Sequence, residues 1–155
     1  MTGNRKRASS MASTAKATGD KMRHAALLYG CVAAGSVLGG VARYLASLAI
    51  QLGPPFPWAT LFVNVTGSFI IGFYAALSGP DGRLFASAPQ RQFVMTGFCG
   101  GYTTFSTFSL ETFRLLQAGD ARSALANIAA SVGASLLAVW LGHIWASRIN
   151  RVKGS

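Results

Sequence analysis

Apolar residues run along the chain in four long stretches, each near or above the roughly 20 residues that a helix needs to cross a bilayer. The stretches cover about residues 25–50, 58–77, 92–116 and 121–147. Short connections containing glycine or proline separate them, at residues 52–57, 78–82 and 117–120. The pattern predicts an all-α membrane protein with four transmembrane helices in one compact domain.

The third stretch is interrupted by a double glycine and a run of hydroxyl side chains, where residues 97–109 read GFCGGYTTFSTFS. Backbone groups in hydrocarbon must be hydrogen-bonded, so a helix broken at membrane depth survives only where it is buried in protein or lines a wet cavity. Transporters and channels bind their ions at breaks of this kind. We therefore expect a broken third helix that handles an ion.

Polar residues recur at intervals of four in two other stretches, which places them along one side of each helix. They are Thr60, Asn64 and Ser68 in the second stretch and Ser123, Asn127, Ser131 and Ser135 in the fourth. Such stripes fit either a hydrated path or helix–helix adhesion, because Ser, Thr and Asn hydrogen-bond across membrane interfaces. Together with the broken third helix, they favour a path.

The spans hold one acidic residue, Glu111, near the end of the third stretch. Cation channels and proton-coupled carriers usually bind their cargo with carboxylates inside the membrane, so this composition disfavours both. Hydroxyls, the Asn64 amide and backbone N–H groups can donate hydrogen bonds to a small anion. Phe105 and Phe108 can also turn their electropositive ring edges toward an anion, although phenylalanines three residues apart equally fit a packed core.

Charge and composition support a membrane protein. The chain is 51% hydrophobic and only 12% charged, and its mean hydropathy is +0.39. Its net charge of +10 is typical of nucleic-acid binding in a soluble protein, but the basic residues gather at the ends of the spans. Eleven of them precede the first span, flank the second loop or follow the last span: Arg5, Lys6, Arg7, Lys16, Lys21, Arg23, Arg83, Arg91, Arg148, Arg151 and Lys153. This placement argues against a nucleic acid partner and favours cytoplasmic termini.

The tails differ from the apolar body. Residues 1–23 are low-complexity and basic without an apolar run, and we expect them to be disordered. Met22 is an alternative translation start that would remove most of the basic excess. Residues 24–148 would form the functional four-helix domain, and residues 149–155 a basic C-terminal tail.

Three motifs in order resemble the fluoride-specific channel family (Fluc, also called CrcB): GGVARY at residues 39–44, TLFVNVTGSF at 60–69 and GFCGGYTTFSTFS at 97–109. The resemblance covers about residues 28–148. It implies a passive fluoride-selective channel of the cell (inner) membrane that exports fluoride from the cytoplasm and relieves its toxicity. It also implies an antiparallel, dual-topology homodimer of four-helix subunits, with two pores that each use residues of both subunits.

The resemblance assigns roles to ten residues. Those of the fluoride pore are Phe105, Phe108, Asn64, Ser131, Ser135, Thr104, Ser106 and Arg43. Main-chain carbonyls of Gly100 and Thr103 would hold a structural Na⁺, not transported, at the dimer centre, as suits a hard cation. Arg43 equally fits a side chain that snorkels to the headgroups. Asn127 stands where some relatives carry tyrosine, so its pore role, like the role of Glu111, stays open.

The spacing of Gly35 and Gly39, four residues apart, lets membrane helices approach closely, as does Gly67 with Gly72. We expect these glycines to help close the dimer. The basic N-terminal tail departs from the family pattern, because a dual-topology chain should show little Lys/Arg bias between its two sides.

Two other functions fit part of this pattern. A small multidrug-type secondary transporter needs a carboxylate in the first membrane helix, and this chain has none there. An accessory membrane protein would use the hydroxyl stripes only to bind helices to a partner. An enzyme is not expected, because no acid, base and nucleophile cluster in the spans.

Overall fold

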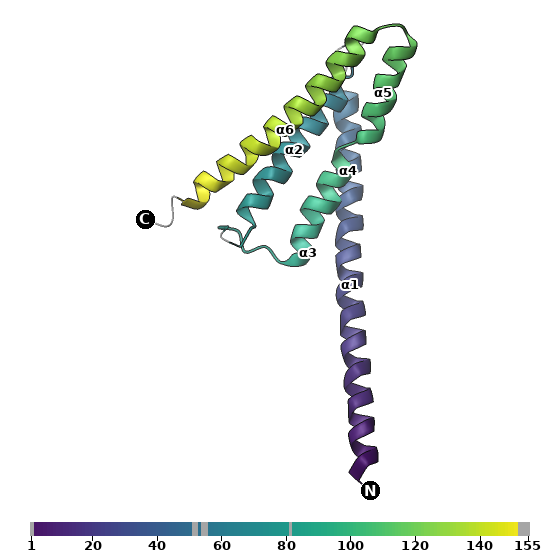
Figure 1. The fold of residues 1–155 in the computed structure, drawn as a ribbon, viewed down its shortest axis with the longest axis vertical. Helices are drawn as coiled ribbons and strands as arrows, with labels where there is room; N and C mark the ends of the chain where they lie inside the picture. The colour runs from purple at the N-terminus through teal and green to yellow at the C-terminus, as the bar shows by residue number, and fades with distance from the viewer. Residues whose placement is uncertain (1, 51–52, 54–55, 81, 152–155) are drawn as a thin grey trace.

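The computed structural model describes residues 2–50, 53, 56–80 and 82–151, with side chains from Lys16 onward, and the regular elements within these ranges are helical (Figure 1). In chain order they are α1 (Thr2–Ala49), α2 (Trp58–Leu77), α3 (Ala88–Arg91), the π-helix η1 (Gln92–Cys99), α4 (Gly100–Tyr102), α5 (Phe105–Gln117) and α6 (Ala121–Arg151).

Three helices are long and apolar enough to cross a membrane. They are Lys16–Ala49 within α1, α2 and α6. The third predicted span is instead divided into η1, α4 and α5, with a break at Thr103 and Thr104. The expectation of an all-helical membrane protein and of a broken third segment is therefore confirmed.

The N-terminal segment differs from the expectation. Residues 1–23 were expected to be disordered, but α1 is already helical from Thr2 and extends beyond the other helices (Figure 1). The segment contains no proline and is rich in Ala, Lys, Arg and Met, which favour helix. Extending an existing helix also needs no new nucleus. At the other end, α6 continues to Arg151, and residues 152–155 of the expected tail lie outside the described residues.

Four glycines bring α1 into backbone contact with η1 and α4. They are Gly35 and Gly39 on α1, Gly97 on η1 and Gly101 on α4. A methyl group at any of them would overlap the facing backbone: at Gly39 it would meet Phe98, and at Gly101 it would meet Ser36. Because residue numbers increase together along this glycine seam, the two segments run parallel. The expected dimer role of Gly35 and Gly39 is thus corrected, since both pack within the chain.

α2 and α6 run parallel to each other and pack by the same means (Figure 1). Gly72 of α2 lies against the backbone of Val139, and Gly142 of α6 lies against that of Phe69. At the far end Asn150 Nδ2 donates to the Ala76 carbonyl at 3.0 Å, and Asn150 Oδ1 accepts from the Arg83 amide at 3.1 Å. These bonds hold the end of α6 against the loop that follows α2.

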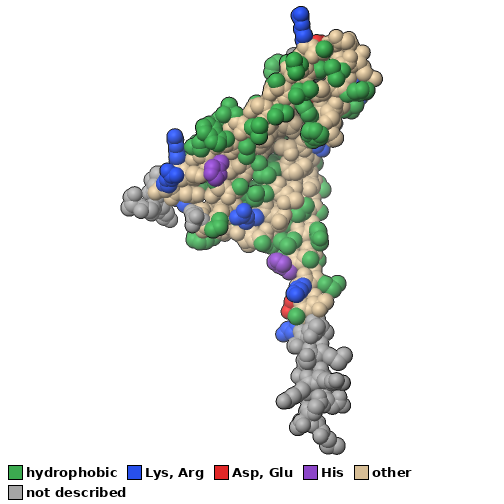
Figure 2. Space-filling model, viewed as in Figure 1, with side chains coloured by type: hydrophobic (Ala, Val, Ile, Leu, Met, Phe, Trp, Pro, Cys, Tyr) green, Lys and Arg blue, Asp and Glu red, His purple; other side chains and the backbone are tan. Residues whose placement is uncertain are grey.

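Large apolar side chains cover much of the outer surface. Tyr29 is 76% exposed and Leu125 is 68% exposed. Figure 2 shows hydrophobic side chains spread over the visible face of the helical body, while most Lys and Arg side chains lie at its ends. An apolar surface of this extent is costly in water and is typical of a lipid-facing one.

Candidate functional site

The break between α4 and α5 consists of two extended residues. Thr103 has ψ 158° and Thr104 has ψ 122°, whereas the residues on either side are helical. The amide and the hydroxyl of Thr103 both donate to the Cys99 carbonyl at 2.9 Å, which completes the last turn of the first half. The hydroxyl of Thr104 accepts from the Thr107 amide at 3.1 Å and caps the start of α5.

Asn64 on α2 satisfies the backbone that the break exposes. Its Oδ1 accepts from the Thr104 amide at 2.7 Å, and its Nδ2 donates to the Thr104 carbonyl at 3.0 Å. In a continuous helix the Thr104 amide would instead donate to the carbonyl of Gly100. The side chain of Asn64 therefore replaces one helical hydrogen bond of the Thr104 amide. The Gly100 carbonyl is left without its helical partner.

A pocket of about 410 Å³ opens beside this break. Eight of the ten predicted site residues line it: Asn64, Gly100, Thr103, Thr104, Phe105, Phe108, Ser131 and Ser135. These residues come from α2, α4, the break, α5 and α6, so the fold brings together positions far apart in sequence. The N-terminus of α5, with its partial positive charge, also lies at this pocket.

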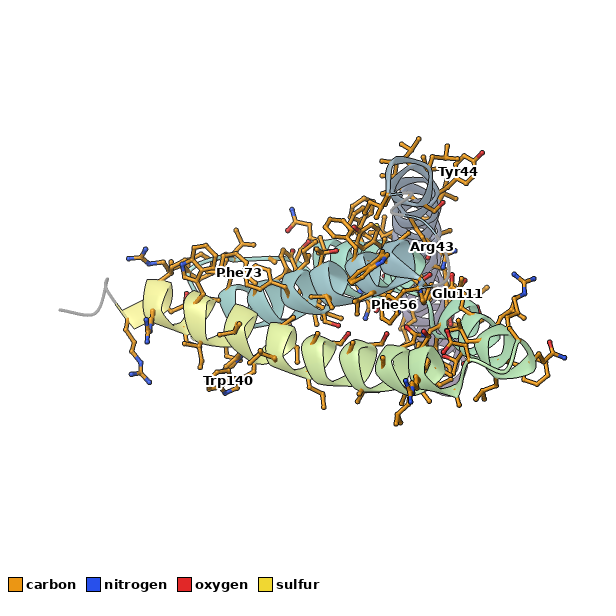
Figure 3. The ribbon with its side chains drawn as sticks, turned by 90° about the horizontal axis from the view of Figure 1, so that it is seen from above. Arg43, Tyr44, Phe56, Phe73, Glu111 and Trp140 are labelled. Atoms are coloured by element: carbon orange, nitrogen blue, oxygen red, sulfur yellow. The ribbon has the colours of Figure 1, made fainter. Side chains whose placement is uncertain are left out.

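The remaining two predicted residues lie outside the lining. The Ser106 hydroxyl is exposed and lies 3.3 Å from that of Thr104. Arg43 reaches inward from α1, and its Nη1 donates to the Thr103 carbonyl at 3.3 Å. Figure 3 shows Arg43 and Glu111 near the place where α1, α2 and α5 meet. A carbonyl oxygen has two lone pairs, so Arg43 occupies one of the two that Thr103 offers.

The two phenylalanines differ sharply in exposure although their rings are neighbours. Their centroids lie 5.6 Å apart with planes tilted by 47°. Phe108 is only 9% exposed, whereas Phe105 is 79% exposed. Core packing accounts for the position of Phe108 within the chain, but it does not account for Phe105.

A buried hydrogen-bond chain lies behind the pocket. The Ser131 hydroxyl donates to Asn127 Oδ1 at 3.2 Å, Asn127 Nδ2 donates to the Thr112 hydroxyl at 2.9 Å, and that hydroxyl donates to the Phe108 carbonyl at 2.8 Å. Asn127 is fully buried and does not line the pocket. Its amide joins α6 to α5, so this member of the polar stripe serves helix–helix adhesion. Ser131 and Ser135 of the same stripe line the pocket.

Glu111 is half-buried against α2. Thr60 donates its hydroxyl hydrogen to Glu111 Oε1 at 2.9 Å, and Oε2 is buried without a hydrogen-bond partner among the described residues. The described residues contain no group of three or more His, Cys, Asp or Glu side chains that could hold a metal.

The rest of the pocket wall is largely apolar and was not predicted as a site. It includes Ile71, Met95, Val132 and Leu136, with Cys99, Gly67 and Ser68. Apolar residues in a membrane span give no sequence signal that separates a pocket wall from a lipid face. Ser68 is the exception, because it was predicted as a member of the polar stripe with Thr60 and Asn64, although not as a site residue.

Comparison with known proteins gives consistent matches. The family described as "CrcB-like protein, Camphor Resistance (CrcB)" matches residues 30–143. The chain is 66% identical over 138 residues to "Fluoride-specific ion channel FluC 1" of Rhodopseudomonas palustris (strain BisB18), covering 88% of this chain and 98% of the relative. It is 65% identical over 130 residues to the protein of the same name from Bradyrhizobium diazoefficiens, covering 84% and 92%. "Fluoride-specific ion channel FluC" of Opitutus terrae is 52% identical over 130 residues.

Proposed function

Because this chain belongs to the CrcB family, we propose that it is a passive fluoride-selective channel of the cell (inner) membrane, which lets fluoride leave the cytoplasm and so relieves its toxicity. The observation that carries the proposal is the pocket at the helix break, in a chain 66% identical to a fluoride-specific channel. A channel moves its ion unchanged, so no catalytic group is required.

The chemistry of the pocket suits a small anion. Its described lining contains hydroxyls, the Asn64 amide, the start of α5 and two phenyl rings, and no charged side chain. Neutral donors hold an anion weakly enough for it to leave again. Fluoride gains most from such donors, because it is the smallest halide and the strongest hydrogen-bond acceptor among them.

The complete pore is proposed to need a second copy of the chain in the opposite orientation, with the broken segment as a fourth transmembrane unit. Two exposed features support this. Phe105 is 79% exposed although it lines the pocket, and the surface beside Gly100 is open, with nothing within 4 Å of an added methyl group. A partner at the break would cover both and would contribute residues to each of two pores.

A structural Na⁺ is proposed at the same break, bound by the Gly100 and Thr103 carbonyls of both subunits. The donor type fits, because Asn64 diverts the amide that would otherwise bond to the Gly100 carbonyl and because the end of a half-helix carries partial negative charge. Na⁺ would supply a positive charge that joins the carbonyls of two subunits. Arg43 already donates to the Thr103 carbonyl, so this oxygen would serve both cations.

Proteoliposomes that contain only this protein should release fluoride rapidly and retain chloride, because the pocket offers short-range donors and not a fixed charge. Ion-selective electrodes measure both effluxes. Equal release of the two ions would contradict selectivity. A multidrug-type transporter would show flux coupled to a proton gradient, and an accessory protein would show no flux at all.

Phe105→Ile should reduce fluoride efflux by about tenfold, since it keeps an apolar side chain but removes the electropositive ring edge, worth about 1.5 kcal/mol at most. Its stability should be unchanged, because Phe105 is exposed within the chain. Phe108→Ile should lower efflux similarly and should also lower stability. Phe85→Ile is the matched control, because Phe85 is 99% exposed and away from the pocket. Normal efflux through the Phe105 variant would remove its ring from the pore.

Replacing Na⁺ with N-methylglucamine throughout purification and reconstitution should abolish fluoride efflux, and no radioactive Na⁺ should cross with fluoride when Na⁺ is present. Gly100→Ala should leave the fold of the chain intact, because Gly100 has helical backbone angles and open space, yet it should weaken dimerisation and Na⁺ dependence. Gly133→Ala is the control, since Gly133 is equally open. Full activity without Na⁺, or Na⁺ co-transport, would refute the proposed ion site.

A further inference from the structure

A second groove, of about 540 Å³, runs along the outside of α6 near its C-terminal end. Its lining consists of Phe69, Trp140, Leu141, Ile144, Trp145 and Arg148. Five of these side chains are apolar and the sixth is a cation at one end of the groove. This arrangement differs from the pocket at the break, where hydroxyl groups line the wall.

The groove opens on a different face of the helices from the pocket. At 100° per residue, the positions of α6 that line the groove centre about 130° around the helix from Ser131 and Ser135. Trp140 points outward from α6, away from α2 (Figure 3). Trp140 and Trp145 remain 57% and 58% exposed. The groove therefore lies where the chain meets its surroundings, and not where the proposed second subunit would complete the pore.

The aromatic wall of the groove is held in place by the α2–α6 contact. The Trp145 ring lies edge-on to Phe69 at 5.8 Å and to Phe73 at 6.0 Å between centroids. The phenyl rings of Phe69 and Phe73 stack at 5.9 Å. Close packing of this kind makes the groove a preformed surface, and tryptophan is a residue that membrane proteins favour near the headgroups.

Arg148 supplies the charge at the end of the groove. It is exposed, and no carboxylate within the described residues pairs with it. Asn150 binds the Arg83 amide at 3.1 Å, which brings the basic loop after α2 to the same end of α6 that carries Arg151. In the subunit whose Lys/Arg-rich end faces the cytoplasm, this end of α6 lies at the anionic leaflet.

We propose that this groove binds one anionic phospholipid, with an acyl chain along the aromatic wall and the headgroup phosphate on Arg148. The apolar wall matches a hydrocarbon chain, and a guanidinium pairs with phosphate through two parallel hydrogen bonds. Zwitterionic lipids fill the same groove less well, because their own ammonium group offsets the attraction of the phosphate to Arg148.

The test uses the tryptophans of the groove as reporters. The chain has three, and Trp58→Phe leaves only Trp140 and Trp145, both in the groove. The full-length Trp58→Phe protein is reconstituted in mixtures in which either phosphatidylglycerol or phosphatidylcholine carries brominated acyl chains, which quench tryptophan on contact. Quenching should favour phosphatidylglycerol by about fivefold, the effect of one cation near a lipid surface.

Two substitutions and one control separate the effect of the charge from that of the groove. Arg148→Ala should reduce the preference to about equal quenching, while Arg122→Ala, at the other end of α6, should leave it unchanged. Ile144→Phe fills the groove and should lower the preference although Arg148 is present. A preference that survives Arg148→Ala, tryptophans that neither lipid quenches, or quenching relieved by excess inorganic phosphate would each overturn the proposal. None of these measurements depends on fluoride conduction.

Discussion

Gly39→Val should prevent the chain from reaching its native helix packing, whereas the same substitution at the next residue, Gly40, should not. A methyl group at Gly39 would overlap the backbone at Phe98, whereas one at Gly40 would meet nothing within 4 Å. Backbone cannot move aside as a side chain can, so we expect a cost above about 3 kcal/mol, the upper end for overpacking. Heating fusions to a fluorescent protein before size-exclusion chromatography measures the loss.

Gly40→Val is a close control for Gly39→Val. Both residues are helical glycines on α1, and valine is a slightly better helix former than glycine, so Gly40→Val should be neutral or mildly stabilising. Gly30→Val is a second control, because Gly30 also has open space around it. If Gly39→Val and Gly40→Val gave the same melting temperature, the close contact between α1 and η1–α4 would be wrong.

Asn64→Leu should destabilise the chain and abolish conduction together. Leucine has a similar volume but cannot bond the Thr104 amide and carbonyl, which Asn64 holds at 2.7 Å and 3.0 Å. Leaving two such groups unpaired in an apolar environment costs about 4 kcal/mol, which corresponds to about 10 °C in melting temperature for a chain of this size. The break would then reorganise, because the freed amide can return to the Gly100 carbonyl.

Ser68→Ala is the matched control for Asn64→Leu. Ser68 lies one turn further along α2 and lines the same pocket, but the break does not depend on it. We expect the Ser68 variant to keep the melting temperature of the original chain. An Asn64→Leu protein with unchanged stability would show that the break is held by other contacts, and its fluoride efflux would then test the pore role of the amide alone.

The sequence predicts the membrane helices well where composition changes abruptly. Pro57 and Gly79 bound an apolar run, and α2 spans Trp58–Leu77 as predicted. The turn at Gly119, with φ 77°, separates α5 from α6 as predicted. The start of α1 was missed, because low complexity and basic charge are shared by disordered segments and by exposed helices. The π-helical form of η1 has no sequence signature that we could have used.

The sequence predicts a break within residues 97–109 but not its position there. Both residues of the double glycine are helical, and Gly101 is needed for contact with Ser36. The extended residues are Thr103 and Thr104, and the partner that stabilises them is Asn64, 40 residues away. A long-range hydrogen bond of this kind cannot be read from local sequence. The pocket residues were predicted through the family resemblance.

The pairing of the helices has a consequence for the order in which the protein is made. α1 packs on η1 and α4, and α2 packs on α6, so the partner of each of these two helices is synthesised much later. The hydrogen bonds that join them span 60 residues from Arg43 to Thr103 and 74 residues from Ala76 to Asn150. While α1 and α2 are the only helices inserted, their glycine surfaces face lipid. The first half of the nascent chain therefore cannot fold before the second half has entered the bilayer, and chains truncated before α6 should be recognised as unassembled by membrane quality control.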